Sequence, residues 1–182
     1  MASHILEAYQ EDIEVRTTGL EGGNTTGYKV EVHEIQPGNV YQDENIKVKA
    51  FLVKHGSWKE ALGYRFEAQG KSIVVSGDTS PAESVVGACG GCDALIHEVY
   101  SGRAPNDAKP SMSVEQWMKY MSQFHTSAEE LGEIAAKAKP KMLILTHWIL
   151  LGNAKPDDML REIRQKYSGP IIIARDLDVI AP

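Results

Sequence analysis

Four short segments of the sequence place acid–base and metal-ligating side chains directly after apolar, β-prone runs. A strand end is a rigid position for a ligand, and several strand ends that meet at one edge of a sheet form a site. Neutral imidazole and carboxylate groups are the ligands that zinc-like ions accept in proteins. The pattern therefore indicates a metal-dependent or acid–base site. The segments are 53–56 (VKHG), 75–79 (VSGDT), 95–98 (LIHE) and 145–148 (LTHW).

Asp78 lies between Gly77 and Thr79 at the end of one of these runs. The small residue before the acid lets backbone or metal approach closely. A carboxylate at this position can bridge two cations, because it has two oxygens and about four lone pairs. His55 and His147 follow apolar runs in the same way. A single histidine at a strand end is more often structural, and Gly-Asp-Thr alone is often a turn, so the prediction depends on these residues occurring together.

The first part of the chain shows helical spacing followed by short alternating stretches. Residues 5–13 have the spacing of an amphipathic helix, and residues 14–27 form a Gly/Thr/Asn-rich loop. Residues 28–35 alternate with period two, which predicts a strand, and a turn follows at 37–39. Because short turns join the later strands, we expect a β-meander. Its further strands are predicted at 46–54, 63–67 and 72–76, the last two joined by a tight turn at 69–71.

After Asp78 the pattern changes to helices that alternate with short strands. Ser80 and Pro81 are the residue types expected at the N-cap and first position of a helix. Ser127 and Glu130 have the spacing of a capping box. Strands followed by αβ alternation favour one layered α/β domain over residues 1–182. The other predicted elements are strands at 93–97, 141–146, 170–174 and 177–180, helices at 114–124, 127–138 and 156–167, and a polar loop at 101–112.

The composition is that of an ordinary globular domain, with 182 residues, 42% hydrophobic and 24% charged. No apolar run approaches the ~20 residues that a membrane span needs, and the N-terminus does not have the pattern of a signal peptide. Two cysteines do not make a secreted disulfide framework. We therefore expect a cytosolic (cytoplasmic) protein. A net charge of −6 without a Lys/Arg cluster argues against a broad nucleic-acid surface.

Taken in order, the segments resemble the C-terminal half of the metallo-β-lactamase-fold hydrolases. The most similar branch contains ribonuclease Z, arylsulfatase-like and lactonase-like enzymes. The resemblance covers roughly residues 28–182 and includes the segments 62–66 (LGYRF) and 125–127 (HTS) as well. It implies an α/β fold in the form of a partial αββα sandwich, with the metal site along one edge of the two sheets.

The same resemblance implies a role for five residues. His55 would be a ligand of one metal ion, His147 of the other, and Asp78 the bridge between them. His125 and Glu98 would form a proton-shuttling pair beside the scissile bond. The cofactor would be two ions of zinc, manganese or iron. Such ions acidify a water molecule and polarise the substrate's oxygen, which implies hydrolysis of an ester, lactone, sulfate ester or phosphodiester.

The chain departs from this family's pattern in two places. The His-x-His-x-Asp-His motif that supplies further ligands is absent from the sequence, so we expect an N-terminally truncated member whose motif would lie upstream of Met1. Bacterial-type ribonuclease Z enzymes often carry a long tRNA-gripping insertion where this chain has only the tight turn at 69–71. Together with the negative charge, the short turn favours a small ester-type substrate over nucleic acid.

Loss of the first strands of a sandwich would leave apolar faces and edges uncovered. We therefore expect a homo-oligomer, most simply a homodimer, or association with a complementing N-terminal half. The alternative to a metal-dependent hydrolase is a non-catalytic fold remnant that acts as a structural or interaction domain.

Two further motifs have more than one interpretation. Cys89 and Cys92 have C-x-x-C spacing, which is typical of a redox motif or of a Gly-rich turn with two small buried side chains, whereas a zinc knuckle is improbable without a second pair. An aromatic and methionine stripe at helical spacing lines either a substrate mouth or, more commonly, a core or subunit contact. The stripe consists of Trp117, Met118, Tyr120, Met121 and Phe124.

Overall fold

The computed structural model describes residues 1–102 and 112–182 and contains two compact units, an N-terminal unit (Met1–Ile35) and a sheet unit (Gln36–Pro182). The N-terminal unit contains α1 (Ala2–Ala8) and α2 (Gln10–Thr17), neither of which buries a residue. The single helix predicted at 5–13 is wrong, because the helical stretch is interrupted at Tyr9, between α1 and α2. The strand predicted at 28–35 is also wrong, since these residues pair with no strand among those described and remain extended and largely exposed.

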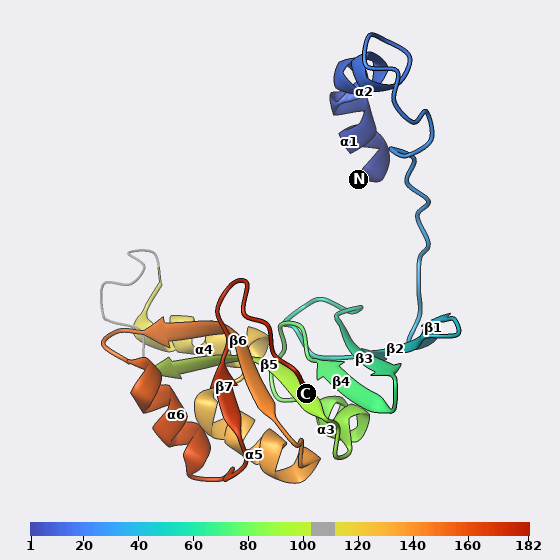
Figure 1. The fold of residues 1–182 in the computed structure, drawn as a ribbon. Coiled ribbons are helices and arrows are strands. Elements are labelled where there is room, and N and C mark those ends of the chain that lie inside the picture. The colour runs from blue at the N-terminus through green and yellow to red at the C-terminus, as the bar shows by residue number, and fades with distance from the viewer. Residues whose placement is uncertain (103–111) are drawn as a thin grey trace. The chain divides into compact units, whose positions relative to one another are not determined.

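The sheet unit is built on one seven-stranded sheet whose strands follow one another in chain order (Figure 1). The first four strands form the predicted antiparallel meander, and the last four are parallel to one another. The predicted α/β class is therefore confirmed, although the first strand begins inside the predicted turn. The strands are β1 (Gly38–Gln42), β2 (Ile46–Leu52), β3 (Leu62–Ala68), β4 (Lys71–Val75), β5 (Ala94–Gly102), β6 (Leu143–Leu151) and β7 (Ile171–Ile173).

The predicted tight turn between β3 and β4 is a two-residue hairpin. Ala68 pairs with Lys71, and both residues between them have positive φ angles, 50° at Gln69 and 73° at Gly70. Two consecutive positive φ angles match the right-handed twist of the two strands, and glycine adopts such angles without steric cost. This turn fixes the register of β3 against β4, and thereby the position at which β4 ends.

Within the described residues, four helices lie in the connections of the parallel part of the sheet. Two of them begin with capping boxes, at Ser113 and at the predicted Ser127. The predicted cap at Ser80 is wrong, because the Ser80 N–H donates to the Lys54 carbonyl at 2.7 Å and the helix begins after Ala82. None of the helices described is long and apolar enough to cross a membrane. The helices are α3 (Glu83–Cys89), α4 (Val114–Phe124), α5 (Ala128–Ala138) and α6 (Pro156–Arg164).

Two other predicted elements differ from the structure in whole or in part. The last predicted strand, at 177–180, does not form, and Leu177 and Val179 are each 98% exposed. Within the polar loop predicted at 101–112, residues 101 and 102 continue β5, whereas 103–111 lie outside the described residues. The domain boundary predicted at 1–182 stays a prediction.

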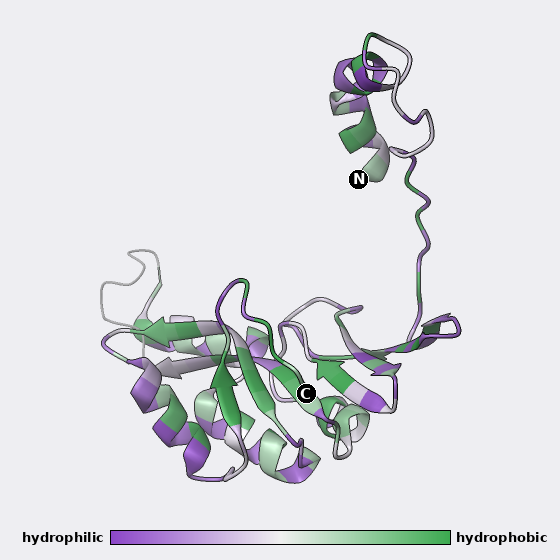
Figure 2. Cartoon of the chain, in the orientation of Figure 1, coloured by the Kyte–Doolittle hydropathy of each residue, from purple (hydrophilic) through white to green (hydrophobic). Residues whose placement is uncertain are grey.

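The core lies between one face of the sheet and helices α3, α5 and α6 (Figures 1 and 2). Side chains alternate across the strands, so that Val74, Leu95 and Leu143 enter this core together with helix residues such as Leu131 and Ile163. The opposite face is also apolar, but its side chains are only partly buried. They include Tyr64, Phe66, Ile73, Val75 and Ile96, which register brings side by side.

Helix α5 approaches α6 at Gly132, where an added Cβ would lie 2.7 Å from the Ile163 carbonyl oxygen. Gly87 in α3 has open space instead, with nothing within 4 Å of the same position. We expect Gly87→Ala to raise the free energy of unfolding by ~0.5–1 kcal/mol through helix propensity. Gly132→Ala should lower it by ~1–3 kcal/mol through overpacking. Urea unfolding followed by circular dichroism measures both, and a gain at both positions would contradict the close approach of the two helices.

Candidate metal centre

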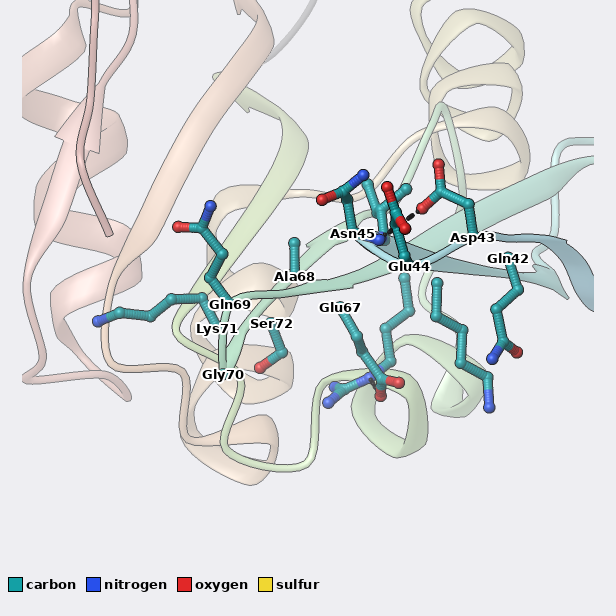
Figure 3. Close-up of a pocket in the computed structure, with 13 residues that line it drawn as sticks. Gln42, Asp43, Glu44, Asn45, Glu67, Ala68, Gln69, Gly70, Lys71 and Ser72 are labelled. Atoms are coloured by element: carbon teal, nitrogen blue, oxygen red, sulfur yellow. Dashed lines mark hydrogen bonds and ion pairs between the residues drawn. The ribbon is translucent and has the colours of Figure 1, made fainter.

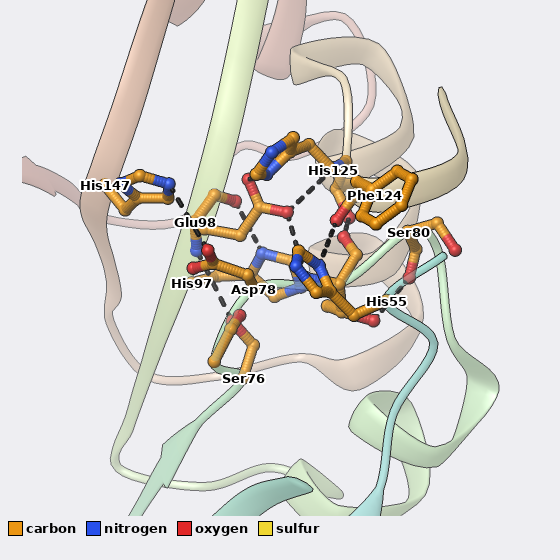
Figure 4. Close-up of polar contacts among 12 residues, drawn as sticks. His55, Ser76, Asp78, Ser80, His97, Glu98, Phe124, His125 and His147 are labelled. Carbon is orange, nitrogen blue, oxygen red and sulfur yellow. Dashed lines mark hydrogen bonds and ion pairs between the residues drawn. The ribbon is translucent and has the colours of Figure 1, made fainter. Parts of the chain in front are cut away.

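The predicted site residues gather beyond the end of β4 and against the middle of the longer strands β5 and β6 (Figure 4). Asp78 follows β4, Glu98 lies in β5, His147 lies in β6, and His125 directly follows α4. The strand ends predicted at Glu98 and His147 are wrong, because β5 continues to Gly102 and β6 to Leu151. β2 and β4 run in the same direction, since each is antiparallel to β3, so that His55 after β2 and Asp78 after β4 follow strand ends on the same side of the sheet.

A β-bulge places His147. Glu98 pairs with Thr146 and Val99 pairs with Trp148, so that His147 is the extra residue between them. Its φ angle of 42° lies in the left-handed region, which costs a residue with a Cβ about 1–2 kcal/mol. Bulges of this kind redirect one side chain out of the normal alternation and are frequent beside functional sites. The backbone is thus strained at the one position that turns the imidazole toward Asp78.

Three of the side chains form a compact donor cluster, which consists of Asp78, His125 and His147. The Asp78 Oδ2 atom lies 3.4 Å from the His147 Nε2 atom, and the rings of His125 and His147 have centroids 5.6 Å apart. One ligand atom from each residue lies within 4.8 Å of the other two. The side chains of Asp78 and His147 are 43% and 50% exposed, whereas His125 is buried, so the cluster opens to solvent on one side.

The chemistry of this donor set fits a divalent cation. Asp78 and His147 offer a carboxylate and an imidazole, the ligand types of catalytic zinc sites, and only a neutral His125 would complete the three protein ligands usual at such sites. The same donors also suit manganese and iron. Two of the three residues, Asp78 and His147, are predicted ligands, whereas His125 is predicted to shuttle protons. Sequence reasoning therefore missed how close His125 comes to the other two.

Glu98 holds two loops of this cluster through hydrogen bonds. Its buried carboxylate accepts hydrogen bonds through Oε1 from the backbone N–H groups of Thr79, at 3.1 Å, and Thr126, at 3.0 Å. Its Oε2 atom lies 3.4 Å from His125 Nδ1 but is not aligned for a hydrogen bond. The loop with Asp78 and the loop with His125 are thus both tied to one side chain.

Burial and pairing shift the proton equilibria of Glu98 and His125. Burial raises the pKa of the Glu98 carboxyl, an effect that the neighbouring His125 ring and the hydrogen bonds from the two backbone N–H groups oppose. The neighbouring Glu98 carboxylate raises the pKa of His125, and burial opposes this second shift. Both groups therefore bind protons more readily in the folded chain than in the unfolded chain.

His55 lies beside the donor cluster rather than within it. Its Nδ1 atom is 2.9 Å from the Phe124 carbonyl oxygen, and its ring centroid is 5.7 Å from that of His125. Its predicted role as a metal ligand stays a prediction.

The histidine before Glu98 is structural. His97 is fully buried, its Nδ1 atom lies 2.6 Å from the Glu98 carbonyl oxygen, and its Nε2 atom has no hydrogen-bond partner among the described residues. Burial lowers the pKa of His97 to about 4, so this ring is neutral at physiological pH. Its side chain alternates with that of Glu98 along β5 and is not part of the donor cluster.

Cys89 and Cys92, for which two interpretations were open, are joined by a disulfide in the turn between α3 and β5, and both are buried. Neither cysteine belongs to the donor cluster.

A hollow of about 430 Å³ lies at the other end of β4, around the β1–β2 and β3–β4 turns (Figure 3). Its lining mixes cations such as Lys47 and Lys71 with acids such as Asp43 and Glu67, and contains none of the predicted site residues. We therefore assign the chemistry to the donor cluster and not to this hollow.

The pairing of Glu98 with His125 predicts a pH dependence of stability. A group with a raised folded-state pKa stabilises the fold below its unfolded pKa, about 6.5 for histidine, and loses that contribution as pH rises through the folded value. We expect the free energy of unfolding of the chelator-treated protein to fall as pH rises above about 6.5. The lowered pKa of His97 acts only below this window.

Guanidinium unfolding at several pH values measures this decline, and Glu98→Gln should flatten it because the charge that raises the pKa of His125 is gone. An equal decline in the variant would contradict the coupling.

Comparison with known proteins places the chain in a family. Residues 7–148 match the family described as a Beta-lactamase superfamily domain. A ribonuclease Z of Mycobacterium tuberculosis strain H37Rv is 27% identical over 173 residues, which cover 94% of this chain and 61% of the relative. A ribonuclease Z of Mycolicibacterium gilvum is 29% identical over 178 residues, covering 97% and 60%. Coverage reaches 75% in one further M. tuberculosis relative, but this chain spans about 60% of the length of most of these relatives.

Solved structures share the fold. The metallo-beta-lactamase fold protein YhfI from Bacillus subtilis superposes with a TM-score of 0.58 at 22% identity, over 78% of this chain and 52% of YhfI. The short form of human tRNase Z superposes with a TM-score of 0.50 at 25% identity, over 79% of this chain and 44% of that protein. The predicted partial fold is confirmed. The matched domain and the shared fold show that this chain belongs to the metallo-β-lactamase superfamily of hydrolases.

Proposed function

We propose that this protein is a metal-dependent hydrolase that cleaves a phosphodiester bond of RNA. The observation that carries the proposal is the solvent-open cluster of Asp78, His125 and His147, two of whose loops are held by the buried Glu98 carboxylate. Its membership of the superfamily supports hydrolysis as the reaction class.

The substrate class rests on the relatives. The curated relatives reported above are ribonucleases Z, and this favours an RNA phosphodiester over the small ester, lactone or sulfate ester expected from the sequence. The short turn between β3 and β4 removes only one means of holding RNA, and it does not bear on the chemistry at the scissile bond.

Within this proposal, Asp78 and His147 would hold a divalent cation, with His55 a predicted ligand of a second one. A cation bound there acidifies water and polarises a phosphoryl oxygen. The raised pKa of His125 favours a proton on that ring, so we assign it to proton transfer to the leaving oxygen. Glu98 orients the ring of His125 and compensates its positive charge, in keeping with the predicted shuttle.

Two kinds of variant separate cation binding from proton transfer. His147→Ala should abolish hydrolysis of a single-stranded RNA and of bis(p-nitrophenyl) phosphate, and should weaken Mn²⁺ or Zn²⁺ binding measured by calorimetry. His125→Asn should lower hydrolysis by ~10²–10⁴-fold while cation binding is retained. His33→Ala, at an exposed histidine of the N-terminal unit, serves as the control.

A wild-type protein that hydrolyses neither substrate at any tested concentration of Mn²⁺ or Zn²⁺ would overturn the proposal. That outcome would leave the alternative of a non-catalytic structural or interaction domain. Equal loss of cation binding in both variants would instead make His125 a ligand and remove its assignment as the proton donor.

We also infer that the chain associates with a second copy or with a complementing N-terminal half. The partly exposed apolar face of the sheet supports this inference, since large contiguous apolar patches commonly mark interaction sites. The expected cytosolic location stays a prediction.

Analytical ultracentrifugation should show a species larger than the 20.0 kDa chain at micromolar concentration. Phe66→Asp, in the centre of the apolar face, should shift the protein toward monomer, whereas Tyr9→Asp in the N-terminal unit should not. A monodisperse wild-type monomer would contradict self-association, and retention of the oligomer by Phe66→Asp would show that another surface forms it.

A further inference from the structure

Three segments of the chain each carry one predicted site residue, and each forms hydrogen bonds with both of the others. They are the 54–56 segment after β2, the 77–80 segment after β4 and the 123–126 segment at the end of α4. Their site residues are, in the same order, His55, Asp78 and His125. Because the segments are far apart in the sequence, only tertiary contacts can set their relative positions.

The 54–56 and 77–80 segments are joined on both sides of Lys54. Its N–H donates to the Thr79 hydroxyl at 3.1 Å, and its carbonyl accepts from the Ser80 N–H at 2.7 Å. Lys54 and Ser80 thereby form a short antiparallel bridge. Since Lys54 directly precedes His55, these bonds fix the backbone from which the His55 ring projects.

The 54–56 and 123–126 segments are joined next to the His55 ring (Figure 4). The Gly56 N–H donates to the Gln123 carbonyl at 2.9 Å, and the His55 Nδ1 atom lies 2.9 Å from the Phe124 carbonyl oxygen. Phe124, from the aromatic stripe of the sequence, also meets this ring edge to face at 5.0 Å. A carbonyl oxygen only accepts hydrogen bonds, so the neutral His55 ring carries its proton on Nδ1 and leaves the Nε2 lone pair free.

Thr79 is the residue at which these links meet. It is fully buried, and each of its polar atoms has a partner. Its N–H donates to Glu98 Oε1 at 3.1 Å, and its carbonyl accepts from the Thr126 hydroxyl at 2.6 Å. Its own hydroxyl accepts from the Lys54 N–H and donates to the Ser80 carbonyl at 2.6 Å. A buried polar network with every member satisfied holds one arrangement of the chain.

We propose that Thr79 is a positioning residue of the candidate metal centre. It holds the segments with His55, Asp78 and His125 in the geometry that binds a cation, before any cation is bound. This inference rests on the proposed function, to which it adds a residue outside the donor cluster. Hydrogen-bond partners that orient metal ligands typically change metal affinity by ~10–100-fold when they are substituted.

Thr79→Val tests the proposal, because valine keeps the shape of threonine and removes only the hydrogen bonds of the hydroxyl. Its affinity for Mn²⁺, measured by calorimetry, should be ~10–100-fold weaker than that of the wild type. Thr79→Ser keeps the hydroxyl and should bind Mn²⁺ as the wild type does. The matched control is Tyr167→Phe, which removes a buried hydroxyl that donates to the Pro140 carbonyl ahead of β6. It should lower the urea midpoint of unfolding and leave Mn²⁺ affinity unchanged.

A second measurement needs no cation. In the EDTA-treated protein, the NMR shifts of the His55 ring nitrogens report which of them carries the proton. At about pH 8, where imidazole is neutral in water, the wild type, Thr79→Ser and Tyr167→Phe should show the Nδ1–H form alone. Thr79→Val should show a mixture of both tautomers, because the backbone before His55 loses one of its two attachments.

The outcomes separate this inference from the proposed hydrolase. Wild-type Mn²⁺ affinity or an unchanged His55 tautomer in Thr79→Val would overturn the positioning role. An equal loss of affinity in Thr79→Ser or Tyr167→Phe would also overturn it, as would a wild type that binds no Mn²⁺. The expected results in all variants, with no hydrolysis of RNA or bis(p-nitrophenyl) phosphate by the wild type, would support the positioning role and count against the hydrolase alone.

Thr126→Val takes the place of Thr79→Val if that variant does not fold. It removes the hydroxyl that donates to the Thr79 carbonyl, and the same loss of Mn²⁺ affinity is expected. Wild-type affinity in Thr126→Val would then overturn the proposal.

Discussion

The buried carboxylate of Glu98 is the interaction on which the site depends. One oxygen accepts hydrogen bonds from the backbone N–H groups of Thr79 and Thr126, which lie in two loops 47 residues apart in the sequence. The Thr126 hydroxyl also donates a hydrogen bond to the Thr79 carbonyl, which joins the two loops directly. The other oxygen faces His125. A carboxylate without these partners would be costly to bury, and without it neither loop would have a fixed position. The geometry of Asp78 and His125 is therefore a consequence of how one buried charge is satisfied.

The sheet supplies the second constraint. A meander of antiparallel strands passes into parallel strands at β4, which ends at Val75 while β5 and β6 continue to Gly102 and Leu151. Helices on one face bury the core and hold the strands in register, while the bulge at His147 turns a single side chain out of the alternation. Stability comes mainly from the packed face, and the strained residue in β6 is tolerated because its neighbours are already fixed.

Local interactions can be recognised in the sequence, and they are sufficient to predict several helices and turns. The Ser127–Glu130 capping box, the helix over Val114–Phe124 and the hairpin turn at Gln69 each depend on residues within a few positions of one another. The order of the strand-end motifs was also sufficient to indicate the family. Tertiary structure alone decided which residues meet. His125 joins Asp78 and His147, His97 is buried, and residues 28–35 pair with none of the described strands. Each outcome depends on contacts between distant segments, which no local pattern encodes.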